Sequence, residues 1–205
     1  MSMKPHLVIL IFTILLFGYL APQVAMSEDA AQPTAVRQQN ITPGALRIEF
    51  ESGNYTIRAS EKQEIVVTYH AATPEKLRAV KVEIKPETRG AEIFVRHTPN
   101  DDFYATIDVP RRSDLWVRLT AGDLKIEDIE GNKDLESNAG DITIEVPHPE
   151  VYSRVDASVI AGDIDARAFN VSKSGLFRSF HQSGSGKYRL HARLMAGDLI
   201  FSPGA

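Results

Sequence analysis

The chain has 205 residues, of which 43% are hydrophobic and 24% are charged. This composition is typical of a globular protein that can bury a sizeable core. The formal net charge is −4, with acids and bases interspersed, so the basic footprint of a nucleic-acid-binding protein is absent and we expect no nucleic-acid partner. The sequence has no cysteine, which excludes disulfides, cysteine-ligated zinc, thiol chemistry and a lipid-modified N-terminal cysteine.

The first 27 residues have the pattern of a secretory signal peptide. A short start with one firm positive charge precedes residues 7–21, which carry no charge. Small residues follow, and Ala25 and Ser27 suit the positions before a cleavage site, so we predict cleavage before Glu28. An uncleaved membrane anchor is the alternative, but the apolar run is short against the ~20 residues that a spanning helix needs. We expect membrane contact only through this segment, if it is not cleaved.

The rest of the chain divides into a lead and one domain. Residues 28–43 are polar, contain proline and show no period, which predicts a flexible linker. The domain is expected over residues 44–205. Before its repeats, the chain has one stretch that can hold a helical turn, residues 74–80, and four strand-like runs, residues 65–69, 80–84, 93–95 and 103–109.

The tripeptide Ala-Gly-Asp occurs four times, at intervals of 18, 22 and 35 residues. Regular self-similarity of this kind is the signature of a repeat protein. A degenerate fifth copy, Ser52-Gly53-Asn54, stands near the start of the domain. The glycine and aspartate pairs of the four copies are Gly122 and Asp123, Gly140 and Asp141, Gly162 and Asp163, and Gly197 and Asp198.

The residues on both sides of each tripeptide alternate between apolar and polar, which predicts half-buried strands. The tripeptide interrupts this alternation and is interpreted as a corner. Glycine tolerates the positive φ that a corner requires, and aspartate can accept hydrogen bonds from nearby backbone N–H groups. We therefore predict an all-β protein, a single-stranded β-solenoid or β-helix of stacked short strands with an irregular N-terminal part. An antiparallel β-sandwich would satisfy the same pattern and remains the alternative.

The repeat resembles that of the bacterial "putative adhesin" domain family of unknown function. The segments that carry the resemblance are residues 107–111, 115–126, 135–144 and 186–199. The resemblance implies a β-solenoid at the cell surface or in the envelope, and it implies no enzymatic activity. One departure is the interval between Asp163 and Asp198, where residues 169–180 lack the tripeptide and an insertion or loop is expected.

The repeated aspartates have two open interpretations. They are turn residues, as Asn54 in the same position indicates, or they form a ladder of carboxylates that binds a cation such as Ca²⁺. The histidines are scattered, without the short spacing of metal ligands, so we predict no metal site and no cofactor. Asp101 and Asp102 form a carboxylate pair that could do acid–base work on a glycosidic bond, although acidic residues in loops serve solubility far more often.

One local patch is a candidate for binding. Trp116 and Arg118 are out of phase with the apolar Leu115 and Val117, so they are expected on the opposite, exposed face of a strand. An exposed tryptophan beside arginines can stack on a sugar or on another protein. The predicted binding residues are Trp116, Arg118, Arg111 and Arg112.

From these observations we expect an exported, non-enzymatic protein of the cell envelope or surface, located in the periplasm, at the surface or secreted. Its expected role is adhesion or envelope assembly, with an envelope polymer or protein as partner. The alternative is a carbohydrate-active β-helix enzyme that acts on a polysaccharide.

Overall fold

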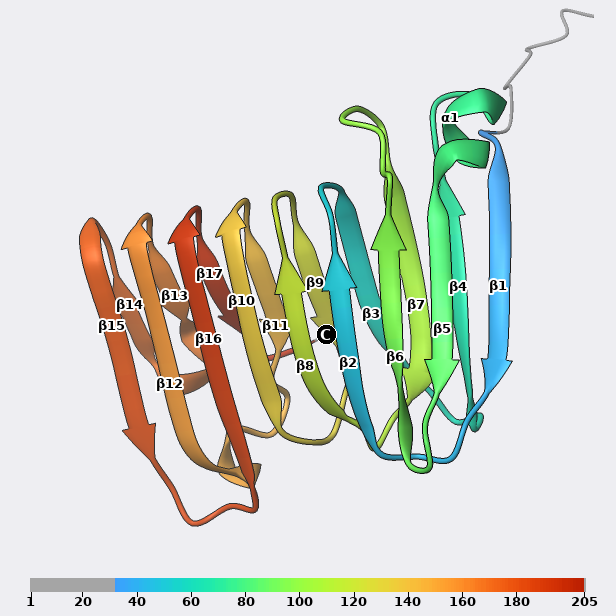
Figure 1. Cartoon of the computed structure of the whole chain (residues 1–205). Coiled ribbons are helices and arrows are strands. Elements are labelled where there is room, and N and C mark those ends of the chain that lie inside the picture. Colours follow the sequence, from blue (N-terminus) through green and yellow to red (C-terminus); the bar gives the residue numbers. More distant parts are fainter. Residues whose placement is uncertain (1–31, 205) are drawn as a thin grey trace, which may run out of the picture. The chain divides into compact units, whose positions relative to one another are not determined.

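The structure is a computed structural model that describes residues 32–204. The predicted signal peptide and the first residues of the predicted linker lie outside this range. Within it, the chain forms 17 strands and three short helices, and the strands build two large sheets that face each other (Figure 1). The all-β class is therefore confirmed.

We call the nine-stranded sheet A and the eight-stranded sheet B. In spatial order, sheet A holds β1 (Thr34–Asn40), β4 (Glu64–His70), β7 (Tyr104–Pro110), β3 (Asn54–Ser60), β9 (Leu124–Glu127), β11 (Ile142–Glu145), β17 (Leu199–Ser202), β13 (Ile164–Ala166) and β14 (Val171–Lys173). Sheet B holds β15 (Leu176–Ser183), β12 (Tyr152–Ala161), β16 (Tyr188–Ala196), β10 (Lys133–Ala139), β8 (Asp114–Leu119), β2 (Ala45–Phe50), β6 (Gly90–Arg96) and β5 (Lys81–Pro86). The helices are α1 (Pro74–Ala79) and two 3₁₀ turns, Pro149–Val151 and Arg167–Phe169.

Both sheets are parallel in the middle and antiparallel at the ends. In sheet B the parallel run extends from β12 to β6, and in sheet A it extends from β7 to β13. The strands β15 and β5 of sheet B, and β14, β4 and β1 of sheet A, are added antiparallel. The arrangement is sandwich-like, but its central strands are parallel and not antiparallel as in the predicted alternative.

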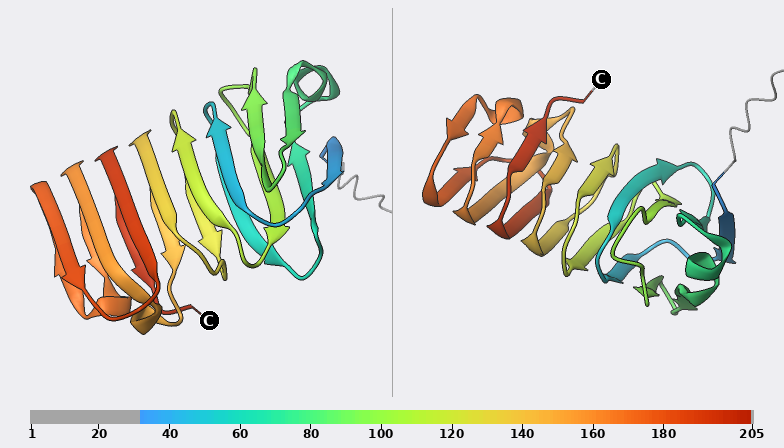
Figure 2. Two further views of the ribbon diagram at one scale, coloured as in Figure 1. Left: turned by 60° about the horizontal axis from the view of Figure 1, so that its bottom comes forward. Right: turned by 90° about the horizontal axis from the view of Figure 1, so that it is seen from above.

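We use the word coil for a sheet B strand, the corner after it and the sheet A strand that follows. The five coils with a tripeptide or its degenerate copy are β2–β3, β8–β9, β10–β11, β12–β13 and β16–β17. In each of them the corner carries the chain from sheet B to sheet A, and the five corners lie along one side of the stack (Figures 1 and 2).

The coils are not stacked in chain order, and no closed solenoid is present in the described residues. The last coil, β16–β17, lies between β10–β11 and β12–β13. The reason is the segment without a tripeptide, which turns back so that β15 pairs antiparallel with the outer edge of β12 and β14 pairs with β13. Because those edges are occupied, the end of the chain pairs with the inner edges instead.

Part of the predicted flexible linker is also a strand. Residues Thr34–Asn40 form β1, which pairs along its whole length with β4. An edge strand needs only backbone pairing on one side. Because most β1 side chains face solvent, the segment lacks the apolar alternation by which a strand is recognised in sequence.

The core lies between the two sheets and consists of aligned rows of apolar side chains. Each parallel pairing places residues of the same repeat position side by side, so that Val117 of β8 lies beside Ile48 of β2 and Leu135 of β10. All three are completely buried. Burial of such side chains contributes about 25 cal/mol per Å² of apolar surface, which makes these rows the main stabilising element of the stack.

The corners fit together through close backbone contacts. Gly140 has a φ of +99°, and a Cβ atom at this position would lie 2.2 Å from the carbonyl oxygen of Gly122 in the neighbouring coil. The N–H of Gly140 donates to the carbonyl of Ala196 on the other side, at 3.0 Å. Only glycine permits both the left-handed backbone and this approach.

The aspartates of the corners form a hydrogen-bonded ladder. The Oδ1 atom of Asp123 accepts from the backbone N–H of Asp141, and the Oδ1 atom of Asp141 accepts from the N–H of Asp198, at 3.0 and 2.8 Å. The ladder continues from Asp198 to the N–H of Asp163 at 2.9 Å, and it begins with Asn54, which accepts from Asp123 at 3.2 Å. Each side chain therefore satisfies a backbone donor of the next coil.

We expect Asp141→Asn to keep the stability of the wild type and Asp141→Ala to lower it. Asparagine retains the accepting oxygen, as Asn54 does, whereas alanine leaves the N–H of Asp198 without its partner. The expected loss is about 1 kcal/mol in the free energy of unfolding, measured by chemical denaturation. Equal losses in both variants would show that the charge of Asp141, and not its hydrogen bond, is what stabilises the corner.

Candidate functional site

The predicted binding residues Trp116 and Arg118 lie on the outer surface of sheet B. Both belong to β8 and are partly buried. The guanidinium carbon of Arg118 lies 3.9 Å from the centroid of the Trp116 ring, and that of Arg47, from the neighbouring strand β2, lies 4.1 Å away. We call the surface around these three residues the Trp116 face. Two cations packed on one indole hold the ring in a defined orientation.

The charges around the Trp116 face are balanced. Arg118 donates to the backbone carbonyl of Asp134 at 3.1 Å and forms ion pairs with the carboxylates of Asp134 at 3.0 Å and Glu136 at 3.4 Å. Arg47 pairs with Glu49 at 2.8 Å. A shallow hollow of about 360 Å³ lies beside Trp116 and Arg118. The face therefore offers a fixed aromatic ring with hydrogen-bonding groups on both sides and little net charge.

The other two predicted binding residues are engaged elsewhere. Arg111 and Arg112 occupy the turn between β7 and β8. Arg111 forms hydrogen-bonded ion pairs with Asp128 and Glu61, and these two carboxylates raise the pKa of its guanidinium. Arg112 pairs with Glu130 at 3.4 Å. Although these arginines are near Trp116 in the sequence, the four predicted residues therefore do not form one patch.

The structure brings together a group that sequence reasoning missed. Asp134 of β10 lies opposite His191 of β16, and these two and Glu136 each offer a ligand atom within 4.8 Å of the others. Among the described residues this is the one such group of three, and the corner aspartates are not part of it. Arg118 already pairs with both carboxylates, so the group is part of the Trp116 face. Asp134 and His191 are 57 residues apart, which hides their proximity in the sequence.

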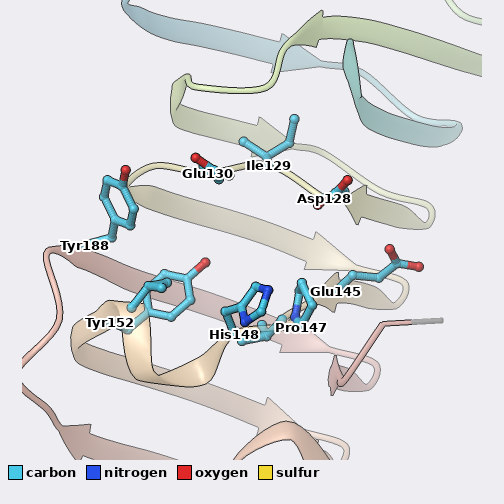
Figure 3. Close-up of a pocket in the computed structure, with 10 residues that line it drawn as sticks. Asp128, Ile129, Glu130, Glu145, Pro147, His148, Tyr152 and Tyr188 are labelled. Carbon is cyan, nitrogen blue, oxygen red and sulfur yellow. The ribbon is translucent and has the colours of Figure 1, made fainter. Parts of the chain in front are cut away.

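A second hollow lies on the side of the stack opposite the tripeptide corners. This cavity of about 280 Å³ lies between the turn from β9 to β10 and the connection from β11 to β12, and Tyr188 at the start of β16 forms part of its wall (Figure 3). Tyr152, Tyr188, Ile129, Val146, Pro147 and His148 are among the residues that line it. We call it the crossover pocket.

A buried lysine lies under the crossover pocket. Lys133 is 2% exposed and occupies the inward position that Leu115 and Leu190 occupy in the neighbouring strands. Its Nζ donates to the carbonyl oxygens of Ile129 and Gly131, at 2.7 and 3.3 Å, and to the hydroxyl oxygen of Tyr152 at 2.7 Å. Burial lowers the pKa of Lys133 to about 8. The sequence hint for a buried lysine is its spacing: Lys133 lies two residues before Leu135 and therefore on the same, inward face of β10.

Asp101, the first residue of the carboxylate pair considered for catalysis, does not have the properties of a general acid. Asp101 lies in the loop between β6 and β7 and accepts from Nζ of Lys76 at 2.6 Å. This hydrogen bond lowers the pKa of Asp101. A glycosidase acid needs a raised pKa in order to hold its proton at neutral pH, so the shift runs in the opposite direction.

Comparison with known proteins gives a likeness of fold. No family model matches the chain, and no curated protein matches it. A solved structure described as a "putative cell adhesion protein" from Clostridium sporogenes has a TM-score of 0.53 at 12% identity and covers 83% of this chain and 99% of its own. A "putative adhesin" from Bacteroides fragilis has 8% identity over 83% of this chain and 98% of its own, but its TM-score of 0.25 is too low to indicate a shared fold. At this identity, the first likeness shows a similar fold and nothing beyond the fold.

The helices of the described residues are short. None of them is long and apolar enough to cross a membrane.

We expect the buried amine of Lys133 to make stability rise with pH between about 8 and 10.5. In this range the unfolded chain still binds the proton that the folded protein has lost, since the pKa falls from 10.5 to about 8 on folding. The unfolding free energy of the wild type, minus that of Lys133→Met, should increase by about 2 kcal/mol from pH 8 to 9.5. Denaturation curves at several pH values measure it, and a difference that does not change with pH would contradict the buried, deprotonating amine.

Proposed function

We propose that this chain is an exported, non-enzymatic binding module of a bacterial cell envelope, which holds an envelope polymer or an envelope protein on the Trp116 face. The export step rests on the signal-peptide pattern of residues 1–27. The observation that carries the binding role is the indole of Trp116 fixed by Arg47 and Arg118 on the outer surface of a broad sheet. We also propose that the stack is a modified β-solenoid, in which two coils, β2–β3 and β16–β17, lie out of chain order.

The surroundings of the Trp116 face favour an extended partner. The parallel register aligns Trp116 with Asp134, His191 and Asp156 on three successive strands, and neighbouring strands lie about 4.8 Å apart. A partner that lies across the strands would therefore meet a regular row of hydrogen-bonding side chains. Because acids and bases alternate along it, the row suits a polymer or protein of low net charge better than a nucleic acid.

A catalytic role has weaker support. The carbohydrate-active enzyme remains the alternative function, and its best candidate acid, Asp101, is paired with Lys76 and has a lowered pKa. The two functions are separable because an enzyme would shorten the polymer that it binds.

We expect the purified protein to be retained on one or more immobilised envelope polymers or envelope protein fractions, and to leave the retaining material intact. Trp116→Ala should reduce retention at least about tenfold, since a central aromatic anchor contributes 2 kcal/mol or more in many interfaces. Tyr104→Ala is a matched control, because Tyr104 is 40% exposed on β7 of the other sheet. Undiminished retention of Trp116→Ala would contradict binding by this face, and release of shorter fragments would favour the enzyme.

A further inference from the structure

The crossover pocket exists because the coils are out of chain order. β16 lies between β10 and β12, so the connection after β11 must pass beyond β16 and β17 before it enters β12. This connection holds Pro147, His148 and the 3₁₀ turn Pro149–Val151, and it leaves a gap to the turn before β10. The gap is the crossover pocket (Figure 3). On the corner side of the stack, the backbones of neighbouring tripeptides are in direct contact.

The two tyrosines give the pocket aromatic walls with polar ends. Tyr152 is 6% exposed, and Figure 3 shows its hydroxyl directed into the space between the two turns. Because this hydroxyl accepts a hydrogen bond from Lys133, its own proton is available to a ligand oxygen. Tyr188 is partly exposed on the neighbouring strand. Aliphatic side chains of Ile129 and Val146 complete the apolar part of the wall.

The rim of the pocket carries three carboxylates that are already ion-paired. Each pairs with a cation outside the pocket and keeps free lone pairs that can accept hydrogen bonds. The pairs are Asp128 with Arg111, Glu130 with Arg112 at 3.4 Å, and Glu145 with Lys125 at 3.5 Å. The ammonium group of Lys133 lies beneath them. Arg111 and Lys125 also pair with Glu61 and Glu127, so negative charge exceeds positive charge around the rim. A ligand that entered would therefore meet many acceptors, one donor and a moderately negative field.

We propose that the crossover pocket binds a single ring of a neutral saccharide. The aromatic walls suit the apolar face of a sugar ring, and the paired carboxylates suit its hydroxyl donors. A free ammonium ligand would have to displace a cation from a carboxylate that is already paired, and an acidic ligand would be repelled by the excess negative charge of the rim. The volume of about 280 Å³ lies just below the roughly 300–1,000 Å³ typical of ligand sites, which favours one ring over a longer chain.

The pocket is distinct from the Trp116 face, and its proposal does not depend on that face. The probes are methyl glycosides of neutral hexoses and of N-acetylated hexosamines, a hexuronic acid, and a hexosamine with a free amine. Saturation-transfer NMR and calorimetry on the purified protein measure binding. At least one neutral glycoside should bind, and both charged sugars should bind more weakly.

Variants separate the pocket from other surfaces. Tyr188→Ala removes a partly exposed wall residue and should weaken binding at least tenfold, whereas Trp116→Ala and Tyr104→Ala should leave it unchanged. Tyr152→Phe keeps the ring and should weaken binding through loss of the hydroxyl donor, with the folded state checked by circular dichroism. Preference for a charged sugar, binding that Tyr188→Ala leaves intact, loss of binding in Trp116→Ala, or no binding of any probe would each overturn the proposal.

Discussion

The stack depends on how the backbone of one corner fits onto the next. At each tripeptide the glycine carbonyl of one coil lies where a side chain of the neighbouring coil would be, and the aspartate of one coil accepts the N–H of the next. A corner N–H lies outside both sheet ladders, and without this acceptor it would lack a partner. Because the same contact recurs between these coils, each corner presents glycine followed by aspartate or, at Asn54, asparagine. The repetition of Gly-Asp at the corners follows from this contact.

The local half of the fold could be predicted because its causes are local. The corners, the inward and outward phases of the strands and the turn of α1 follow from residues close in sequence, such as Gly140 and Asp141. The stacking order could not, because the apolar rows of different coils are nearly interchangeable. It is decided by β15, which covers one edge of β12. The strand β1 has the sequence pattern of a linker, because an exposed edge strand has no buried face and therefore no alternation of apolar and polar residues.

The candidate sites divide in the same way. Trp116 and Arg118 could be placed on an outer face by their phase alone, but the partner of the indole, Arg47, is fixed by the register of β2 against β8. Arg111 and Arg112 are near in sequence, yet their ion pairs hold them at the turns. The crossover pocket is a product of the exchanged coil order. The sequence hint for this pocket is Lys133, a charged residue at a position of β10 where the alternation predicts an apolar, inward-facing side chain.

The inserted position of the last coil also sets an order of events during folding. A chain that is made, or exported, from its N-terminus can complete the coils up to β10–β11 in sequence. The segment with β12–β15 then has no paired neighbour until β16 and β17 are available, since they form the parallel contact between the two parts. Until the last residues of the chain arrive, β10 and β11 present open edges that other chains can join. The C-terminal strands of this protein therefore join the two parts of the stack. A chain that lacks them would leave two parts with unpaired strand edges, which are prone to association.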